Sequence, residues 1–342
     1  MQMKSYQRYC LIVLLGMWTL ITGCEDVEVM TGVPDNVKNI RITMVAKSSD
    51  NPVFLSALSG AEAAASNLSD KYSKMNIKID WRTPKEENPA VQAERIVNAV
   101  NDGTDAIIVA CSSESILTQA IDHAVDKGIP VMTFDSDAPK SKRFAFYGSD
   151  DEKIGETVMN ELADLMGKKG HIAILAGNKE APNLKKRVAG VKKAAAKYPD
   201  INIINVYHHI ESANFAADLV LKINKEHPEL TGWAMIGGWP LFGNGLMTEI
   251  DPNKIKIVAV DALPVQLQYV EKGIVPVLIA QPTFRWGKIS VEKIIDKIYF
   301  NKDVPENIPM QLIRVSIENL GGWSRQLRAW GYKDVPRHYL RM

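Results

Sequence analysis

Residues 106–135 have the sequence AIIVACSSESILTQAIDHAVDKGIPVMTFD, and the fold can be inferred from this stretch outward. It contains an apolar run at Ala106–Cys111, a segment of helical length at Ser115–Lys127, and a second apolar run at Val131–Asp135. Two short apolar runs joined by one helix are typical of parallel strands connected by a crossover. The stretch therefore predicts an α/β unit with a parallel sheet.

The same alternation extends through both halves of the chain. In the first half we expect strands at Ile40–Ala46, Ile77–Arg82, Ala106–Cys111, Val131–Asp135 and Phe144–Gly148, and helices near Leu55–Tyr72, Pro89–Asn101 and Ser115–Lys127. In the second half we expect strands at His171–Ala176, Ile203–His208, Trp233–Gly237, Lys256–Asp261 and Val277–Gln281, and helices near Asp151–Gly167, Leu184–Tyr198, Ser212–Glu226, Phe242–Glu249 and Val265–Lys272. A helix at Arg285–Phe300 and a strand at Gln311–Ile317 would return the chain to each half. This pattern predicts two Rossmann-like, doubly wound lobes with right-handed crossovers.

The size and charge of the chain agree with two ordinary folded domains. Its 342 residues are more than one core usually holds. Lys and Arg total 41 against 40 for Asp and Glu, so no field of one sign is available to attract nucleic acid. We therefore expect no nucleic-acid partner.

The N-terminus has the pattern of an export signal. Lys4 and Arg8 precede an apolar run at Cys10–Ile21, which has the length of a signal-peptide core and is short for a bilayer span. The run leads into Ile21-Thr22-Gly23-Cys24, which resembles the bacterial lipobox. This resemblance implies that residues 1–23 are removed and that Cys24 carries a lipid. The alternative is an uncleaved anchor helix.

Residues 24–38 are polar, contain Gly and Pro, and show no lasting periodicity, which suits a tether. Under either interpretation the folded body lies in the cell envelope, anchored to a membrane and facing the periplasm or the cell exterior. After cleavage, Cys111 would be the one thiol besides the lipidated Cys24, so we expect no internal disulfide in the mature body. Because Cys111 follows an apolar run, we expect a small buried residue rather than a nucleophile.

Polar and aromatic side chains follow the predicted strands, at the edge where open parallel sheets bind ligands. These residues are Lys47, Asn51, Phe54, Asp135, Ser136, Trp239, Asp261 and Gln281. A carboxylate accepts several hydroxyl hydrogens, and an amide both donates and accepts. Aromatic rings stack on the apolar face of a sugar ring. The set predicts a small polyhydroxy ligand.

Each candidate also has a structural alternative. Asp135 and Asp261 could cap helices, where Asp is favoured. Phe54 could be a core residue of the first helix. Lys185, which is a candidate by family resemblance alone, shares its helix with several other basic residues and could belong to a solvated face. The loop position of Trp239, after two glycines and before a proline, favours a binding role.

Five segments together resemble the ribose-type periplasmic binding proteins. They are RITMVAKSSDNPVF (41–54), GIPVMTFDSDAP (128–139), FYGSDDEKIGE (146–156), KIVAVDA (256–262) and VLIAQPTFRWGK (277–288), and they occur in the family's order. The resemblance implies two lobes joined by three hinge crossings near Gly148, Gln281 and Pro309. The N-terminal lobe would then comprise residues 39–148 plus 282–309, and the C-terminal lobe residues 149–281 plus 310–342.

Carried over by position, the family pattern implies ligand contacts at Lys47, Asn51, Val53, Phe54, Asp135, Ser136, Lys185, Gly238, Asp261 and Gln281. Several of these depart from the ribose binders. Those proteins have a Ser where Lys47 stands, an aromatic residue at Val53, an Arg at Ser136, an Arg at or next to Lys185, and an Asn at Gly238. The departures argue against ribose itself and favour a larger or differently substituted sugar, including one with an acidic group.

Motifs for catalysis or metal binding are not found in the sequence. It has no G-x-S-x-G elbow, no Walker A loop, and no G-x-G-x-x-G after the first strand. His208 and His209 are adjacent on a predicted strand, so their side chains point to opposite faces and cannot readily share a metal. We expect no enzyme activity, no cofactor and no metal.

The resulting prediction is a monomeric binding protein whose lobes close over a sugar and which, by family resemblance, delivers it to an ABC permease. One alternative is a sensing subunit that presents its ligand to a membrane receptor or histidine kinase. A second is the effector domain of a LacI-type repressor, against which the export signal and the missing helix-turn-helix argue. A third is an enzyme on the same scaffold.

Overall fold

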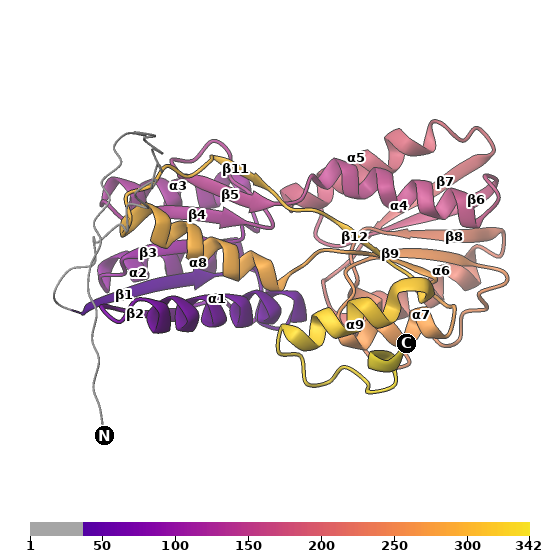
Figure 1. Ribbon diagram of the computed structural model, residues 1–342. Coiled ribbons are helices and arrows are strands. Elements are labelled where there is room, and N and C mark those ends of the chain that lie inside the picture. Colours follow the sequence, from indigo (N-terminus) through magenta and orange to yellow (C-terminus); the bar gives the residue numbers. More distant parts are fainter. Residues whose placement is uncertain (1–36) are drawn as a thin grey trace, which may run out of the picture. The chain divides into compact units, whose positions relative to one another are not determined.

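The computed structural model describes residues 37–342, which form α/β structure on two separate sheets (Figure 1). The predicted signal peptide, Cys24 and all but the last two residues of the predicted tether lie outside the described residues. Within the described part of the chain, no helix combines the length and the apolar character needed to cross a bilayer.

Both sheets have six strands in the same order. The first sheet has the order β11-β5-β4-β3-β1-β2, and all its pairs are parallel. Its strands are β1 (Lys38–Val45), β2 (Met75–Trp81), β3 (Ala106–Val109), β4 (Val131–Phe134), β5 (Ala145–Gly148) and β11 (Asn307–Pro309). The second sheet has the order β12-β10-β9-β8-β6-β7, and only its β10–β12 pair is antiparallel. Its strands are β6 (Gly170–Ala176), β7 (Ile201–His208), β8 (Leu230–Met235), β9 (Lys256–Val260), β10 (Val277–Ala280) and β12 (Ile313–Val315).

Helices cover both faces of each sheet. On the first sheet, α1 (Pro52–Lys71) and α8 (Phe284–Ile298) pack together on one face, and α2 (Pro89–Asn101) and α3 (Glu114–Asp126) cover the other. On the second sheet, α4 (Asp151–Leu165) and α5 (Pro182–Ala195) share one face, and α6 (Ala213–Glu226), α7 (Leu267–Glu271) and α9 (Leu320–Ala329) cover the other. We call these two assemblies the first lobe and the second lobe. They confirm the predicted α/β class with two doubly wound sheets.

Alternation along the strands gives each sheet two cores. Ile108 of β3 packs with the core under α1 and α8, whereas its neighbours Ile107 and Val109 pack with the core under α2 and α3. Successive side chains of a strand point to opposite faces, and both faces are covered, so the strand is apolar throughout. This is why β3 is a continuous apolar run in the sequence and β4 is apolar except for the buried Thr133.

Reciprocal glycines let two pairs of helices touch through their backbones. A Cβ atom on Gly60 of α1 would lie 1.8 Å from a carbonyl oxygen of α8, and one on Gly287 of α8 would lie 1.9 Å from a carbonyl oxygen of α1. Gly155 of α4 and Gly190 of α5 form a second such pair. A Cβ atom on either glycine would lie 2.0 Å from a carbonyl oxygen of the other helix. Only a residue without a side chain permits these approaches. The glycines therefore set the distance between helices whose N-terminal turns lie beside the strand ends.

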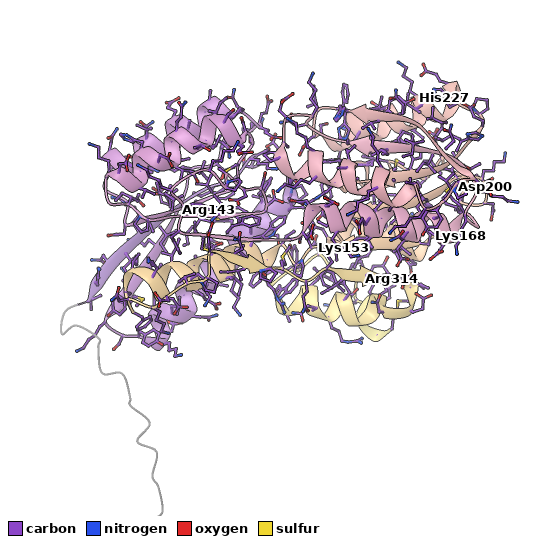
Figure 2. The ribbon with its side chains drawn as sticks, turned by 90° about the horizontal axis from the view of Figure 1, so that it is seen from above. Arg143, Lys153, Lys168, Asp200, His227 and Arg314 are labelled. Carbon is purple, nitrogen blue, oxygen red and sulfur yellow. The ribbon has the colours of Figure 1, made fainter. Side chains whose placement is uncertain are left out.

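The chain passes from the first sheet to the second between β5 and β6, returns between β10 and β11, and passes again between β11 and β12. In the second lobe, the residues Lys168, Asp200 and His227 lie in the connections that precede β6, β7 and β8. They gather at one end of that lobe (Figure 2). The carboxyl ends of the same strands lie at the other end of the sheet, where the candidate site is found.

One expectation for local structure was wrong, and one short strand was not predicted. The helix predicted at Phe242–Glu249 is a series of turns, because Gly243 and Gly245 interrupt it and Gly245 adopts a φ of 75°. The hydroxyl of Tyr269 holds this segment by accepting from the backbone N–H of Leu246 at 3.1 Å. The short strand β11 was not predicted, since three residues carry too little periodicity to identify a strand.

Cys111 is fully buried, as its position after an apolar run predicted. Burial raises the pKa of its thiol well above the ordinary value, which disfavours the reactive thiolate.

Candidate functional site

Side chains that follow strands of both sheets line one small cavity of about 30 Å³, which we call the inner cavity. The predicted residues in its lining are Lys47, Asn51, Val53, Phe54, Asp135, Trp239, Asp261 and Gln281. The other lining residues are Asn183, Leu184, Arg187, Glu211, Gly237 and Trp286. This volume is about the share of one molecule in liquid water, so the lining side chains contact one another directly.

Two of the predicted residues lie outside this lining. Ser136 is buried directly beside Asp135, and its hydroxyl has no hydrogen-bond partner among the described residues. Lys185 is exposed, and its ammonium lies 3.0 Å from the carboxylate of Glu180. The structure therefore does not bring Lys185 to the inner cavity, and the solvated face that was its alternative describes it.

Asp135 and Asp261 occupy equivalent positions in the two lobes. Each is the residue directly after a strand, β4 in the first sheet and β9 in the second, and these strands have the same place in the sheet order. Both have a left-handed backbone, with φ of 56° at Asp135 and 69° at Asp261. Asp enters this region more readily than most residues with side chains, and such conformations cluster at functional sites.

Neither aspartate caps a described helix. The cap of α1 is Asn51, whose side-chain oxygen accepts from the backbone N–H of Val53 at 3.2 Å. The backbone N–H groups of Asp135 and Asp261 instead donate to neighbouring strands, to the carbonyls of Tyr147 and Ile279. Both carboxylates therefore remain available to the cavity.

Lys47 connects the two lobes. Its ammonium donates to the side-chain oxygen of Asn183 in α5 at 3.0 Å and lies 3.4 Å from the carboxylate of Asp135. The amide nitrogen of Asn183 also donates to both oxygens of Asp135, at 3.3 and 3.4 Å. Burial acts to lower the pKa of Lys47, but the charges of Asp135, Glu87 and Glu211 outweigh it and hold that pKa above its ordinary value.

Arg187 is the central cation of the second lobe, and it was missing from the predicted site. Its guanidinium donates to Asp151 at 2.9 Å, to the side-chain oxygen of Gln281 at 3.0 Å, and to the carbonyl of Ile236 at 3.1 Å. One of its nitrogens lies 3.8 Å from the carboxylate of Asp135 in the first lobe. Burial acts against the charged form, but Asp151, Asp135 and Asp261 together raise the pKa of Arg187 above its ordinary value.

The sequence contained a signal for Arg187. The buried residues of α5 include Asn183, Leu184, Arg187, Gly190, Val191 and Ala194, which is the spacing of one helix face. Lys185 is off that face. The ribose binders have an Arg at or next to the position of Lys185. This chain has Arg187 two residues further along, so the cavity has one guanidinium more than the resemblance implied.

Asp261 completes a chain of polar contacts in the second lobe. The amide of Gln281 donates to its carboxylate at 3.0 Å, and the side-chain oxygen of the same Gln281 accepts from Arg187. Burial raises the pKa of Asp261 to about 6, although Arg187 and Gln281 act in the opposite direction.

Aromatic residues form two walls of the inner cavity. Phe54 stacks on Trp286 with ring centres 6.1 Å apart, so it belongs to the core of the first lobe and to the cavity wall at once. Trp239 donates its indole N–H to Glu211 at 3.1 Å, and its ring is nearly perpendicular to that of His209, with ring centres 4.8 Å apart. Both rings are buried.

A larger space of about 1100 Å³ adjoins the inner cavity, and we call it the outer chamber. It shares Lys47, Asn51, Phe54 and Glu211 with the inner cavity. Its other walls come from both lobes and include Asp50, Glu86, Glu87, Asn178, Lys179, His208 and His209. Periodicity could not assign Glu87, Asn178 and Glu211 to a site, because all three lie in connections between strands and helices.

Within residues 37–342, no three His, Cys, Asp or Glu side chains are grouped as a metal site requires. What the inner cavity offers is a set of hydrogen-bonding groups: carboxylates that accept, amides that do both, and two cations that donate. Such a set can bind a ligand with many hydroxyl groups.

The chain is similar to several known proteins. A family model described as the periplasmic binding protein domain matches residues 42–302. The D-ribose/D-allose-binding protein of Pseudomonas aeruginosa is 25% identical over 255 residues, which cover 71% of this chain and 77% of that protein. The xylitol-binding protein of Mycolicibacterium smegmatis is 31% identical over 136 residues, which cover 40% of this chain and 39% of that protein.

Solved structures share the fold. The solute-binding protein of an ABC transporter from Burkholderia graminis, in complex with D-arabinose, superposes with a TM-score of 0.75 at 24% identity. The superposition covers 84% of this chain and 98% of that protein.

Proposed function

Because the chain belongs to the periplasmic binding protein family, as its five strand-end segments predicted, we propose that it captures one sugar between its lobes and delivers it to an ABC permease. The observation that carries this proposal is the inner cavity, where Asp135 and Asp261 stand at equivalent strand ends of the two sheets. Relatives named for ribose, allose and xylitol support a polyhydroxy ligand.

The chemistry of the lining suits such a ligand. The carboxylates of Asp135 and Asp261 can each accept two hydroxyl hydrogens, and charge-assisted bonds of this kind are the stronger ones. Gln281 and Asn183 can donate and accept. Trp239 and Phe54 present ring surface to the C–H groups of a sugar. Lys47 stands where ribose binders have a Ser, so we propose a sugar other than ribose.

Binding requires the lobes to move. The inner cavity of about 30 Å³ is far smaller than the roughly 300 Å³ at which ligand pockets begin. Lys47 and Asn183 form a direct bond across it. A sugar must take the place of this bond with its own hydroxyls, and it drives closure by binding the closed state more tightly than the open state.

We also propose the cellular setting. A signal peptide at 1–23 directs export, a lipid on Cys24 anchors the protein through a tether at 24–38, and the body is a monomer in the cell envelope. The N-terminal lobe comprises 39–148 plus 282–309, and the C-terminal lobe 149–281 plus 310–342. Three crossings let the lobes rotate as rigid bodies.

A thermal-shift panel tests the proposal. The mature protein is melted with pentoses, hexoses, amino sugars, polyols, sugar acids and amino acids, each at millimolar concentration. A ligand that binds the native state raises the melting temperature by mass action. At 100 times its Kd, the ligand stabilises the folded protein by about 2.7 kcal/mol. We expect a clear rise with one class of sugar or polyol.

The variant Asp261→Ala serves as the matched test. The variant should show no sugar-induced shift. It should still melt cooperatively in buffer, because the Asp261 side chain accepts a hydrogen bond from Gln281 but caps no helix. A rise with amino acids alone, or an undiminished sugar shift in Asp261→Ala, would contradict the proposal.

A further inference from the structure

Two carboxylates from opposite lobes meet in the wall of the outer chamber. Glu87 lies in the connection between β2 and α2, and Glu211 in the connection between β7 and α6. Asn178 contacts both: its side-chain amide donates to Glu87 at 3.1 Å, and its backbone N–H donates to Glu211 at 3.2 Å. One residue thus holds the two carboxylates close together.

The outer chamber has too few positive charges to balance its acids. Its charged side chains are Asp50, Glu86, Glu87 and Glu211 on one side, and Lys47 and Lys179 on the other. Lys47 is already bound to Asp135 and Asn183 in the inner cavity, and Lys179 is exposed. Burial and the neighbouring Glu211 raise the pKa of Glu87, although the charge of Lys47 and the hydrogen bond from Asn178 act in the opposite direction.

The inner cavity adds to this imbalance. Besides Lys47 it contains Arg187 as a cation, and Asp135 and Asp261 as further acids. Arg187 is in turn bound to the buried Asp151. A sugar acid would bring another negative charge into this field, whereas a cation would reduce the repulsion.

His209 independently indicates that the wall of the outer chamber lacks a hydrogen-bond donor. It lines the outer chamber, is 8% exposed, and bonds through Nδ1 to the carbonyl of Ile210 at 2.7 Å. A carbonyl only accepts, so Nδ1 carries the proton and Nε2 presents a lone pair. Burial lowers the pKa of His209 and keeps the ring neutral. Nε2 has no partner within residues 37–342, and a buried acceptor of this kind normally has one.

We propose that the outer chamber binds a protonated amine of the ligand, and that the sugar is therefore an amino sugar with a free amine. This inference rests on the proposed sugar-binding function. An ammonium has three N–H donors and no acceptor, which matches the carboxylates of Glu87 and Glu211, and His209, whose buried Nε2 has no partner within residues 37–342, lies in the same wall. The departure from the ribose binders then concerns a basic substituent and not an acidic one.

Calorimetric titration with matched sugars tests the inference. The probes are glucose, glucosamine and N-acetylglucosamine, together with the corresponding galactose and mannose sets, at pH 7 and low salt. In at least one set we expect the free amine to bind tenfold or more tightly than both the parent sugar and the acetylated sugar. Added salt should reduce this preference, because charge attraction is screened.

Isosteric variants locate the effect. Glu87→Gln and Glu211→Gln should each reduce the preference for the amine at least fivefold. Glu87→Gln, whose side chain lies outside the inner cavity, should also leave the affinity for the parent sugar within about twofold. The matched control is Glu226→Gln, which removes the same charge from an exposed site on α6 that pairs with Lys222. It should leave the preference unchanged.

The inference and the proposed function fail in different ways. If a parent or acetylated sugar binds as tightly as the amine in every set, or if both site variants retain the preference, the amine subsite is wrong and sugar binding stands. If none of these sugars binds while another neutral sugar does, the amine subsite is likewise wrong. If no sugar of any class binds, both are wrong.

Discussion

Asp135 and Asp261 have the same residue type, strand position and left-handed backbone in two separate lobes. This repetition is hard to explain by packing, because the left-handed region costs free energy for any residue with a side chain. Holding the two carboxylates at the strand ends is the simplest account of that cost. Their surroundings differ: Asp135 lies beside Lys47, whereas Asp261 accepts from the neutral amide of Gln281.

Asp261 gives the free energy of unfolding a predictable pH dependence. Its pKa rises from an ordinary value of about 3.9 to about 6 in the folded state. The folded chain therefore binds the proton more tightly than the unfolded chain. The stabilisation from this proton is complete below pH 4 and is lost as the pH rises through 6, by up to about 3 kcal/mol.

Asp261→Asn should remove this dependence. Urea unfolding at pH 4, 5, 6, 7 and 8 should show the variant more stable than the wild type above pH 6, with the difference shrinking toward pH 4. Taking the difference cancels the contributions of the other buried acids, Asp151 and Glu87. If the difference in the free energy of unfolding between variant and wild type stays constant from pH 4 to pH 8, the raised pKa of Asp261 is contradicted.

Arg187 and Lys185 offer a matched pair of basic residues on one helix. Arg187→Met leaves Asp151 buried and unpaired, so we expect destabilisation of about 3 kcal/mol and loss of the sugar-induced thermal shift. Lys185→Met removes an exposed ion pair with Glu180 and should change stability by less than about 0.5 kcal/mol. Urea unfolding and the thermal-shift panel measure both. Loss of binding in the Lys185 variant would instead support the original prediction from sequence.

At the scale of elements, the helix pairs α1–α8 and α4–α5 are built alike. Reciprocal glycines bring the backbones of each pair into contact, and the first turns of α1 and α5 carry Asn51 and Asn183 to the cavity. The position of these helices is therefore set by glycines that do not themselves line the inner cavity. A substitution at one of these glycines should therefore displace side chains that line the inner cavity.

Gly155→Ala tests this connection. Its Cβ atom would lie 2.0 Å from a backbone carbonyl of α5, so α4 and α5 must separate, at a cost of about 3 kcal/mol. The displacement moves Arg187 and Asn183, and we expect at least tenfold weaker sugar binding in calorimetry. The control is Gly322→Ala in α9, where the nearest atom is 4.0 Å away and the higher helix propensity of Ala should stabilise by up to about 1 kcal/mol. Equal effects of the two changes would refute the connection.

The elements that sequence predicted well are those with a clear period. The strands before Asp135, Asp261 and Gln281 are apolar runs covered on both faces, so their ends, and with them much of the inner cavity, could be located. Lys185 does not reach the inner cavity, because the buried face of α5 carries Arg187 and not Lys185. Glu87 and Glu211 could not be found, since the course of a connecting loop is set by distant contacts and not by a local period.

For the whole molecule, the important contacts are those that join the lobes. Lys47 and Asn183 are 136 positions apart in the chain, and their bond links the first sheet to α5. Phe284 of α8 also stacks on Trp330, at the end of α9, with ring centres 5.5 Å apart and planes 5° from parallel. No sequence pattern predicts such pairs, because each depends on the arrangement of two complete lobes.

The most direct test of the account is a crystal structure of the mature protein with the sugar that gives the largest thermal shift. We predict one sugar molecule in the inner cavity, with hydroxyls within hydrogen-bond distance of both Asp135 and Asp261 and with the bond between Lys47 and Asn183 replaced by bonds to the ligand. A sugar bound elsewhere, or bound by one lobe while Lys47 keeps its bond to Asn183, would contradict it.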